Sequence, residues 1–269
     1  MSHDISIDPP RGDGLLAAGC LGVVAACGDD DGGSSDKNAA ACKSDNAVNA
    51  GFDKLFSQTP ALQSDKPPSK KDVPKIRANY DKFVAGPLAQ FQKDAPPEIA
   101  GDVKSAVAGT KGLRKGDTSF FMTPEFQAKT TRIDGYIYDN CDGEKTEVKG
   151  PDYAFEGLED SYPAGLRRFK LQNTGKEVHQ MVILERKPGV TESFDQILKL
   201  PQSKAMSKVD DVAEASPVGP GKASYTSADL TKGEYIAVCF LSKGTTSLGK
   251  EGKGPPHFVL GMKKEFKVE

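Results

Sequence analysis

Near residue 144 of this 269-residue chain, the spacing of the apolar residues changes, and this change limits the possible folds more than any other property. Before it, apolar residues recur every three or four positions, which is typical of an α-helix that buries one face. After it, they alternate with polar residues, as in a half-buried β-strand. We therefore expect an α+β chain in which a helical unit precedes a β-rich unit, and the length is sufficient for two domains.

Residues 42–141 are predicted to form a small bundle of three or four helices. Pro87 falls inside a run of helical spacing and is expected to kink or break it. Thr123, followed by a proline, is placed to cap another helix. A shorter helix is expected near 46–57. This range contains no histidine and no catalytic cluster, so no chemistry is assigned to it.

Residues 148–269 are predicted to form an antiparallel Greek-key β-sandwich. Six alternating segments have the pattern of strands, and turn signals such as NTGK at 173–176 separate them. One helix is expected at 191–200, and 201–221 is expected to be a loop. Short strands without a helix between each pair favour a sandwich over a parallel sheet.

The N-terminal residues 1–27 are interpreted as a signal peptide that ends in a lipobox. The apolar run at 15–26 has the length of a signal-peptide core and is too short to span a membrane. It leads into Cys27 through two alanines, as in bacterial lipoproteins, where this cysteine takes a diacylglyceryl group; Cys20 is a poorer candidate. Against this, the first residues are acidic rather than basic, and the alternative is a buried helix over 15–27.

The acidic, Gly- and Ser-rich residues 28–41 are expected to form a disordered tether. With Cys27 acylated, the following chain would lie outside the cytoplasm, held to membrane lipid by more than one acyl chain. Such a compartment permits disulfides. The net charge of −2, with both signs mixed along the chain, indicates no basic surface for nucleic acid.

If Cys20 and Cys27 belong to the leader, three of the five cysteines remain. Cys42 and Cys141 bracket the helical range, which makes them the natural disulfide pair, with two free thiols as the alternative. Three is an odd number, so Cys239 is left unpaired or bound to something else.

Four side chains in the β-rich unit suit a soft metal. His179 stands at the head of an apolar strand, Cys239 ends another strand, and His257 and Met262 close the last loop. Because a sandwich gathers its loops at two ends, these distant positions can meet. Two imidazoles and a thiolate in one plane, with a long axial thioether, are the ligands of a type 1 copper site.

The residues around these four also resemble those of the cupredoxins, the plastocyanin-like blue copper family. The resemblance covers about 150–269 and rests on N-x-G-x-x-x-H at 173–179, L-x-x-G-x-Y-x-x-x-C at 230–239 and H-x-x-x-G-M at 257–262. It implies copper as the cofactor. It also implies a set of ligands, with Met262 axial and three equatorial residues, namely His179, Cys239 and His257.

The sequence departs from the family pattern at the segment between the second and third of these ligands. Seventeen residues separate Cys239 from His257, where the family has only a few. This ligand loop (residues 240–256) is rich in Gly, Lys and Ser and is expected to arch into solvent, which would leave the site less rigid, more exposed or selective for another metal. Pro255 and Pro256 would stiffen its end. Because loop-closure entropy grows slowly with length, the insertion alone need not abolish the site.

The function we expect is that of a membrane-anchored, extracytoplasmic copper protein that passes electrons to a redox partner or handles copper. No acid–base pair is evident in the sequence, so no enzyme activity is assigned. One alternative is a metal-free, cupredoxin-like surface lipoprotein that acts as a binding module. Another is a zinc or redox-sensing site at Cys239. The sequence leaves the oligomeric state open.

Overall fold

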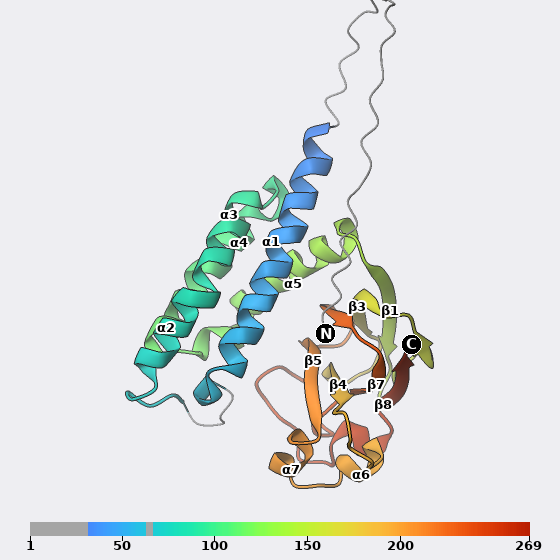
Figure 1. The fold of residues 1–269 in the computed structure, drawn as a ribbon. Coiled ribbons are helices and arrows are strands. Elements are labelled where there is room, and N and C mark those ends of the chain that lie inside the picture. The colour runs from blue at the N-terminus through green and yellow to red at the C-terminus, as the bar shows by residue number, and fades with distance from the viewer. Residues whose placement is uncertain (1–31, 63–66) are drawn as a thin grey trace, which may run out of the picture.

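A computed structural model of the chain describes residues 32–62 and 67–269 (Figure 1). The predicted signal peptide and lipobox at 1–27, with Cys20 and Cys27, lie outside these residues. A helical bundle is followed by a β-sandwich, which confirms the α+β prediction. Among the described residues, no helix is both long and apolar enough to cross a membrane.

The helical bundle is built from five α-helices, with 3-10 turns after the first helix and between the fourth and fifth. The α-helices are α1 (Gly32–Ser57), α2 (Val73–Phe83), α3 (Ala85–Asp94), α4 (Pro97–Thr110) and α5 (Pro124–Asn140). The 3-10 turns are η1 (Pro60–Leu62), η2 (Lys111–Lys115) and η3 (Ser119–Met122). The buried side chains between the helices include Leu55, Ile76, Tyr80, Leu88, Phe91, Val103, Leu113 and Ile137.

Proline and threonine set the helix ends of the bundle largely as predicted. The Thr123 hydroxyl accepts a hydrogen bond from the Phe126 amide and so caps α5. The break expected near Pro87 comes earlier, at Val84, between α2 and α3. Pro87 lies in the first turn of α3, where its missing N–H group has no helical partner to lose. The proline therefore permits a helix start instead of kinking a continuous helix.

The predicted tether over 28–41 is wrong for residues 32–41, which form the first turns of α1. Alanine has the highest helix propensity, and this stretch ends in three alanines. Contacts with the bundle add to it, because Ala41 is buried in the core and Asn38 Oδ1 accepts a 2.7 Å hydrogen bond from the Tyr136 hydroxyl. The short helix predicted downstream is the second half of α1.

Two β-sheets form the sandwich. The strands are β1 (Glu144–Gly150), β2 (Ser161–Tyr162), β3 (Gly165–Asn173), β4 (His179–Arg186), β5 (Val209–Val218), β6 (Ala223–Leu230), β7 (Gly233–Val238) and β8 (Lys263–Val268). One sheet has the order β1-β3-β6 and the other the order β2-β8-β7-β4-β5. Neighbouring strands are antiparallel except β1–β3 and β2–β8, which are parallel. The sheets are therefore mixed and not wholly antiparallel.

Two features of the sandwich differ in position from the prediction. The domain boundary predicted at 148 falls inside β1, which begins at Glu144. The predicted loop over 201–221 contains the helix α7 (Gln202–Met206) and the ten-residue strand β5. The apolar side of β5 is made partly of alanines, and a register shift interrupts its pairing with β4, so its alternation is weak in the sequence. The helix predicted at 191–200 contains α6 (Phe194–Ile197).

The centre of the larger sheet is buried on both faces. Between the two sheets, Met181, Ile183, Tyr235 and Phe266 of the larger sheet pack against residues of the smaller sheet that include Phe169 and Leu171. On the opposite face, α6 covers Val182, Leu184, Ile236 and Val238. Strands β4 and β7 therefore form the rigid middle of the sandwich, and the residues at their ends are held in place.

Candidate metal centre

Strand pairing brings the four predicted ligands to one end of the sandwich. His179 begins β4, and Cys239 directly follows β7, which runs antiparallel beside it. Met262 directly precedes β8, whose first residue pairs with the last residue of β7. His257 begins the 3-10 turn η4 (His257–Leu260), only a few residues before β8. The ends of three adjacent strands, with the 3-10 turn that precedes the last of them, thus supply all four residues.

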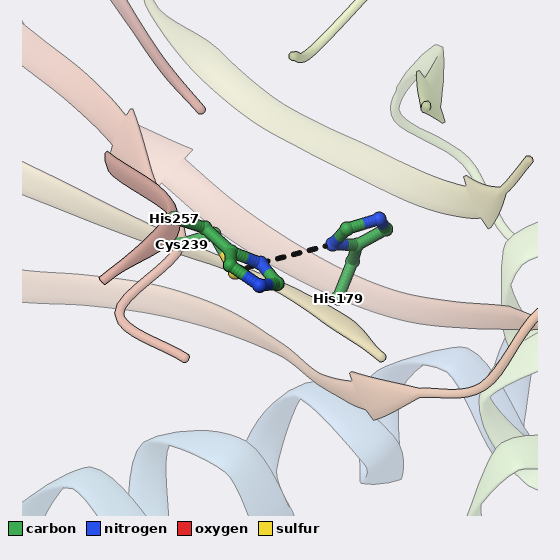
Figure 2. Close-up of side chains that lie close together, drawn as sticks. All are labelled: His179, Cys239 and His257. Carbon is green, nitrogen blue, oxygen red and sulfur yellow. Dashed lines mark hydrogen bonds between the residues drawn. The ribbon is translucent and has the colours of Figure 1, made fainter. Parts of the chain in front are cut away.

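The donor atoms of His179, Cys239 and His257 face one another (Figure 2). The two Nδ1 atoms are 3.2 Å apart, and the Cys239 Sγ lies 3.4 Å from the His257 Nδ1. One donor atom from each residue lies within 4.8 Å of the other two, and all three residues are fully buried. This spacing suits a single metal ion with two nitrogen ligands and one sulfur ligand.

Met262 borders this group and is fully buried. Its amide donates to the His257 carbonyl at 3.0 Å, and its carbonyl accepts from the Cys239 amide at 3.1 Å. A methyl group placed on Gly150 would lie 3.4 Å from Met262 Cε and 3.8 Å from His179 Cδ2. The thioether and the imidazole therefore line the same small space.

The first motif, at 173–179, is a turn held by its own side chains. Asn173 is fully buried; its Nδ2 donates to the Glu177 and Val218 carbonyls, both at 2.7 Å, and its Oδ1 accepts from the Gly175 amide at 2.9 Å. Glycine is required at position 175 because Asp152 and His179 approach its Cα closely. A Cβ atom there would collide with Asp152 Oδ1 and lie 2.6 Å from His179 Nε2. The motif thus fixes the direction from which His179 enters the site.

The second motif, at 230–239, anchors β7. The Tyr235 hydroxyl donates to the Thr231 carbonyl at 2.8 Å, across the turn that precedes the strand. The Tyr235 ring stacks on Phe266 in the core, with ring centres 5.3 Å apart. This anchoring holds the strand that ends at Cys239.

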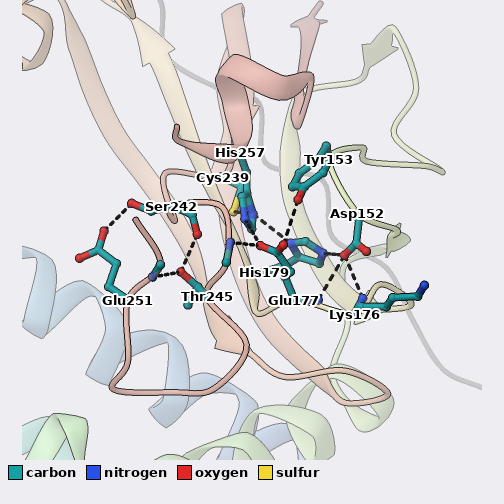
Figure 3. Close-up of polar contacts among 12 residues, drawn as sticks. Asp152, Tyr153, Lys176, Glu177, His179, Cys239, Ser242, Thr245, Glu251 and His257 are labelled. Atoms are coloured by element: carbon teal, nitrogen blue, oxygen red, sulfur yellow. Dashed lines mark hydrogen bonds and ion pairs between the residues drawn. The ribbon is translucent and has the colours of Figure 1, made fainter. Parts of the chain in front are cut away.

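The outer nitrogen of each histidine contacts a carboxylate (Figure 3). His179 Nε2 is 3.1 Å from Asp152 Oδ1, and His257 Nε2 is 3.0 Å from Glu177 Oε2. An ionised carboxylate only accepts hydrogen bonds, so each Nε2 must carry the proton. In this tautomer, the Nδ1 lone pair of each imidazole is left for a metal ion that binds beside Cys239.

Local hydrogen bonds keep both carboxylates in the ionised form. Burial acts to raise the pKa of Glu177, but hydrogen bonds from the Gly244 amide, the Tyr153 hydroxyl and His257 outweigh it and lower the pKa below its usual value. The pKa of Asp152 is also lowered, because backbone amides and His179 outweigh the opposing effect of burial. Both groups can therefore act as acceptors at neutral pH.

Without a metal, burial favours the neutral forms of Cys239 and His179. Burial raises the pKa of the Cys239 thiol to about 11. Burial, with the neighbouring His257, lowers the pKa of His179. A metal ion that binds through the thiolate would displace the proton of Cys239. Its binding would therefore release about one proton in neutral solution.

Tyr153 closes the outer side of the centre in a strained conformation. Its φ angle is 66°, which is uncommon for a residue other than glycine. Its ring meets the His257 ring edge to face at a centroid distance of 5.1 Å, and its hydroxyl donates to Glu177 at 2.9 Å. Burial, with that hydrogen bond, raises the pKa of Tyr153 to about 12.

The ligand loop does not leave the centre open, contrary to our expectation. The His257 amide donates to the Leu241 carbonyl at 2.8 Å, and the Lys243 amide donates to Pro255 at 2.9 Å, so the two ends of the loop run side by side. The Gly244 amide reaches Glu177 at 2.7 Å. The insertion is thus tied to the residues around the ligands, and both imidazoles remain buried.

Sequence reasoning did not identify Asp152, Tyr153 or Glu177. The only signal was an acidic residue two positions before His179 and another just after β1. With 38 acidic residues in the chain, such proximity is not informative before the fold is known.

The other predicted residues lie away from this centre. Cys42 and Cys141 form the predicted disulfide, which joins α1 to the end of α5 and confirms that pairing. Cys239 is a buried free cysteine. Cys27 lies outside the described residues.

No family model and no curated protein matches the chain. Similar solved structures include reduced auracyanin from Roseiflexus castenholzii, at 20% identity, which covers 48% of this chain and 99% of the other with a TM-score of 0.30. An azurin from Methylomonas sp. strain J has 19% identity, with coverage of 48% and 99% and a TM-score of 0.30. Auracyanin A, a "blue" copper protein from Chloroflexus aurantiacus, has 16% identity, with coverage of 48% and 100% and a TM-score of 0.30.

Auracyanins and azurins are cupredoxins, the family that the motifs resemble. With identities and TM-scores this low, the likeness supports no conclusion about function. The fold class follows instead from the two packed sheets. The buried His–Cys–His group is compatible with a type 1 copper site by its donor chemistry alone.

Proposed function

We propose that this chain is a copper-binding electron-transfer protein with a type 1 site. The observation that carries the proposal is the convergence of His179 Nδ1, Cys239 Sγ and His257 Nδ1 within 4.8 Å in a buried, rigid part of the sandwich. Copper in such a site changes oxidation state by one electron. The strands hold the ligands in place and burial excludes water. Asp152 and Glu177 keep the protons on the outer nitrogens of the two histidines.

Two further observations favour electron transfer over copper handling. The imidazoles are fully buried, which would slow the exchange of a bound ion. Phe240 and Val259, which lie next to Cys239 and near His257 in the chain, expose 37% and 61% of their surface. These apolar groups offer a contact surface close to the ligands, where a redox partner could approach.

We further propose that the protein is held on the extracytoplasmic face of the membrane through acylated Cys27. The support is the sequence of the leader and the presence of the Cys42–Cys141 disulfide, which is typical of oxidising compartments. Replacing Cys27 by alanine should release the protein from the membrane fraction. Equal membrane retention of the variant and the wild type would contradict the anchor.

Copper loading tests the metal site. The reduced protein, titrated with Cu²⁺, should bind one equivalent and develop an intense visible thiolate-to-copper band. Cys239→Ser should abolish the band, and His257→Ala should weaken it. Ser242→Ala, in the ligand loop but outside the donor group, is the control and should retain it. A protein purified with zinc, or one that develops no band, would contradict the proposal.

A further inference from the structure

The Glu177 carboxylate connects three separate segments beside the metal centre (Figure 3). Its Oε1 accepts a 2.9 Å hydrogen bond from the hydroxyl of Tyr153, a residue in the segment that follows β1. Its Oε2 accepts from His257 Nε2 at 3.0 Å and from the Gly244 amide, in the ligand loop, at 2.7 Å. Only 14% of its side chain is exposed. A ligand, a strained tyrosine and the ligand loop therefore share one acceptor.

The backbone next to Glu177 makes a second connection to the same loop. The Val178 amide donates to the Thr245 carbonyl at 2.7 Å. The Thr245 hydroxyl, in turn, accepts from the Gly252 amide at 2.9 Å and donates to the Ser242 carbonyl at 2.6 Å. The two sides of the ligand loop are thereby joined to each other close to Gly244, where Glu177 contacts the loop.

Asp152 has a different set of partners. It contacts His179 Nε2 and accepts from the Lys176 and Glu177 amides, and it has no hydrogen bond to the ligand loop. The two carboxylates therefore resemble each other at the histidines but differ in their connection to the loop. Of the two carboxylates, only Glu177 connects the ligand loop to a ligand side chain.

We propose that Glu177 is a positioning residue that holds the ligand loop closed over His257, and that it determines how fast copper enters and leaves the centre. This inference rests on the copper-binding function proposed above. A short ligand loop restricts the cysteine and histidine through its length. Here, the carboxylate supplies that restriction for a loop of seventeen residues.

Two substitutions of Glu177 distinguish its role as a hydrogen-bonding tether of the loop from the effect of its negative charge. Glu177→Ala removes all three contacts. Glu177→Gln removes the charge, but its amide oxygen can still accept from Gly244 and His257 while its NH₂ group faces the tyrosine oxygen. If Glu177 acts as a tether, the glutamine variant should behave much more like the wild type than the alanine variant does. If it acts only by charge, the two variants should be alike.

Glu251→Ala is the matched control. Glu251 lies in the same loop, carries the same charge and accepts from the Ser242 hydroxyl at 2.7 Å, but it makes no contact with a ligand. Its removal should leave copper exchange at the wild-type rate.

The experiment measures the rate at which copper-loaded protein loses its visible band to an excess of a chelator. Glu177→Ala should lose copper at least tenfold faster than the wild type, with partial or full rescue in Glu177→Gln. In the metal-free proteins, hydrogen exchange over 240–256 should be faster in Glu177→Ala than in Glu251→Ala. This second readout does not depend on copper.

The outcomes separate the two proposals. A wild type without the band overturns the proposed function, and this inference with it. A wild type with the band, whose Glu177→Ala variant exchanges copper and loop amides at the wild-type rates, overturns this inference alone. If Glu177→Ala does not fold, Glu177→Asp, whose side chain is one methylene shorter, replaces it; wild-type copper loss and unchanged loop exchange in that variant would also overturn the inference.

Discussion

At the scale of single residues, the outer nitrogens of the two histidines decide which atoms remain for a metal. Asp152 and Glu177 hold the Nε2 protons, so the Nδ1 lone pairs are left for a metal ion that binds beside Cys239. Such outer contacts orient ligands and raise their basicity. The chemistry of the centre thus depends on residues that would not themselves touch the ion.

Gly175→Ala tests this dependence. The added Cβ atom would occupy the space of the Asp152 carboxylate, which must then release His179. We expect copper affinity to fall by about 10–100-fold, the usual effect of losing such an outer contact. Competition with a chelator measures it. Gly219→Ala, where a Cβ atom meets nothing within 4 Å, is the control. Equal affinities in the two variants would contradict the assigned role of Asp152.

Met262→Leu tests the axial position. Leucine fills a similar volume but offers no sulfur, so copper should still bind through the other three residues. Because Cu(II) gains more than Cu(I) from an additional donor, the reduction potential should rise. Voltammetry of the two loaded proteins measures the change. An unchanged potential would show that the thioether does not contact the ion.

At the scale of elements, the most informative features are the strand ends and the loops that they hold. The helix starts and the strands that carry the four predicted ligands could be predicted because proline, capping and alternation act locally. β5 could not, since its buried positions include alanines and its alternation is broken by a register shift. The first turns of α1 were missed because their stability depends on contacts with α5, which composition does not show.

The site was predictable only in part for the same reason. His179, Cys239 and His257 belong to rare residue types, and their order along the chain matches a known motif set. Asp152 and Glu177 belong to the commonest polar class, and only the fold distinguishes them from the other carboxylates. The closed position of the ligand loop likewise follows from long-range contacts, which its Gly- and Lys-rich composition does not encode.

Removal of the disulfide tests how the bundle is stabilised and whether the metal centre depends on it. Cys42 and Cys141 are 99 residues apart and join α1 to the end of α5. Replacing both with serine should destabilise the bundle by up to about 4–5 kcal/mol, because the unfolded chain without the crosslink has a higher conformational entropy. Urea unfolding followed by circular dichroism measures the loss. The copper band should persist in native conditions, because no ligand lies in the bundle; its disappearance would contradict that independence.

At the scale of the whole molecule, the bundle and the sandwich meet along α5 and β6. The rings of Tyr138 and Tyr225 pack across this contact with centres 5.5 Å apart. Asp45, which is buried, and Asp134, which is half-buried, line a pocket beside it together with Arg168 and Glu214 of β5. Burial raises the pKa of Asp45 to about 6, although Arg168 and Asn49 oppose the shift. These carboxyl groups therefore bind protons more tightly in the folded state than in the unfolded chain.

This shift predicts a pH-dependent stability. A carboxyl group with a raised folded pKa stabilises the fold fully below its unfolded pKa, near 3.8, and this contribution is lost as the pH rises through about 6. Asp45→Asn, which stays neutral, should therefore gain stability relative to the wild type between pH 4 and pH 7, by roughly 2–3 kcal/mol at most. Urea unfolding at several pH values measures the difference. A difference independent of pH would contradict the assignment.

The central claim is that four side chains from distant positions bind one copper ion. Electron paramagnetic resonance of the copper-loaded protein tests it most directly, because a thiolate ligand in a type 1 site narrows the copper hyperfine splitting. We predict one equivalent of copper with that narrow splitting in the wild type, and its loss in Cys239→Ser. A wide splitting that is the same in both proteins would show that copper binds elsewhere and would contradict the account.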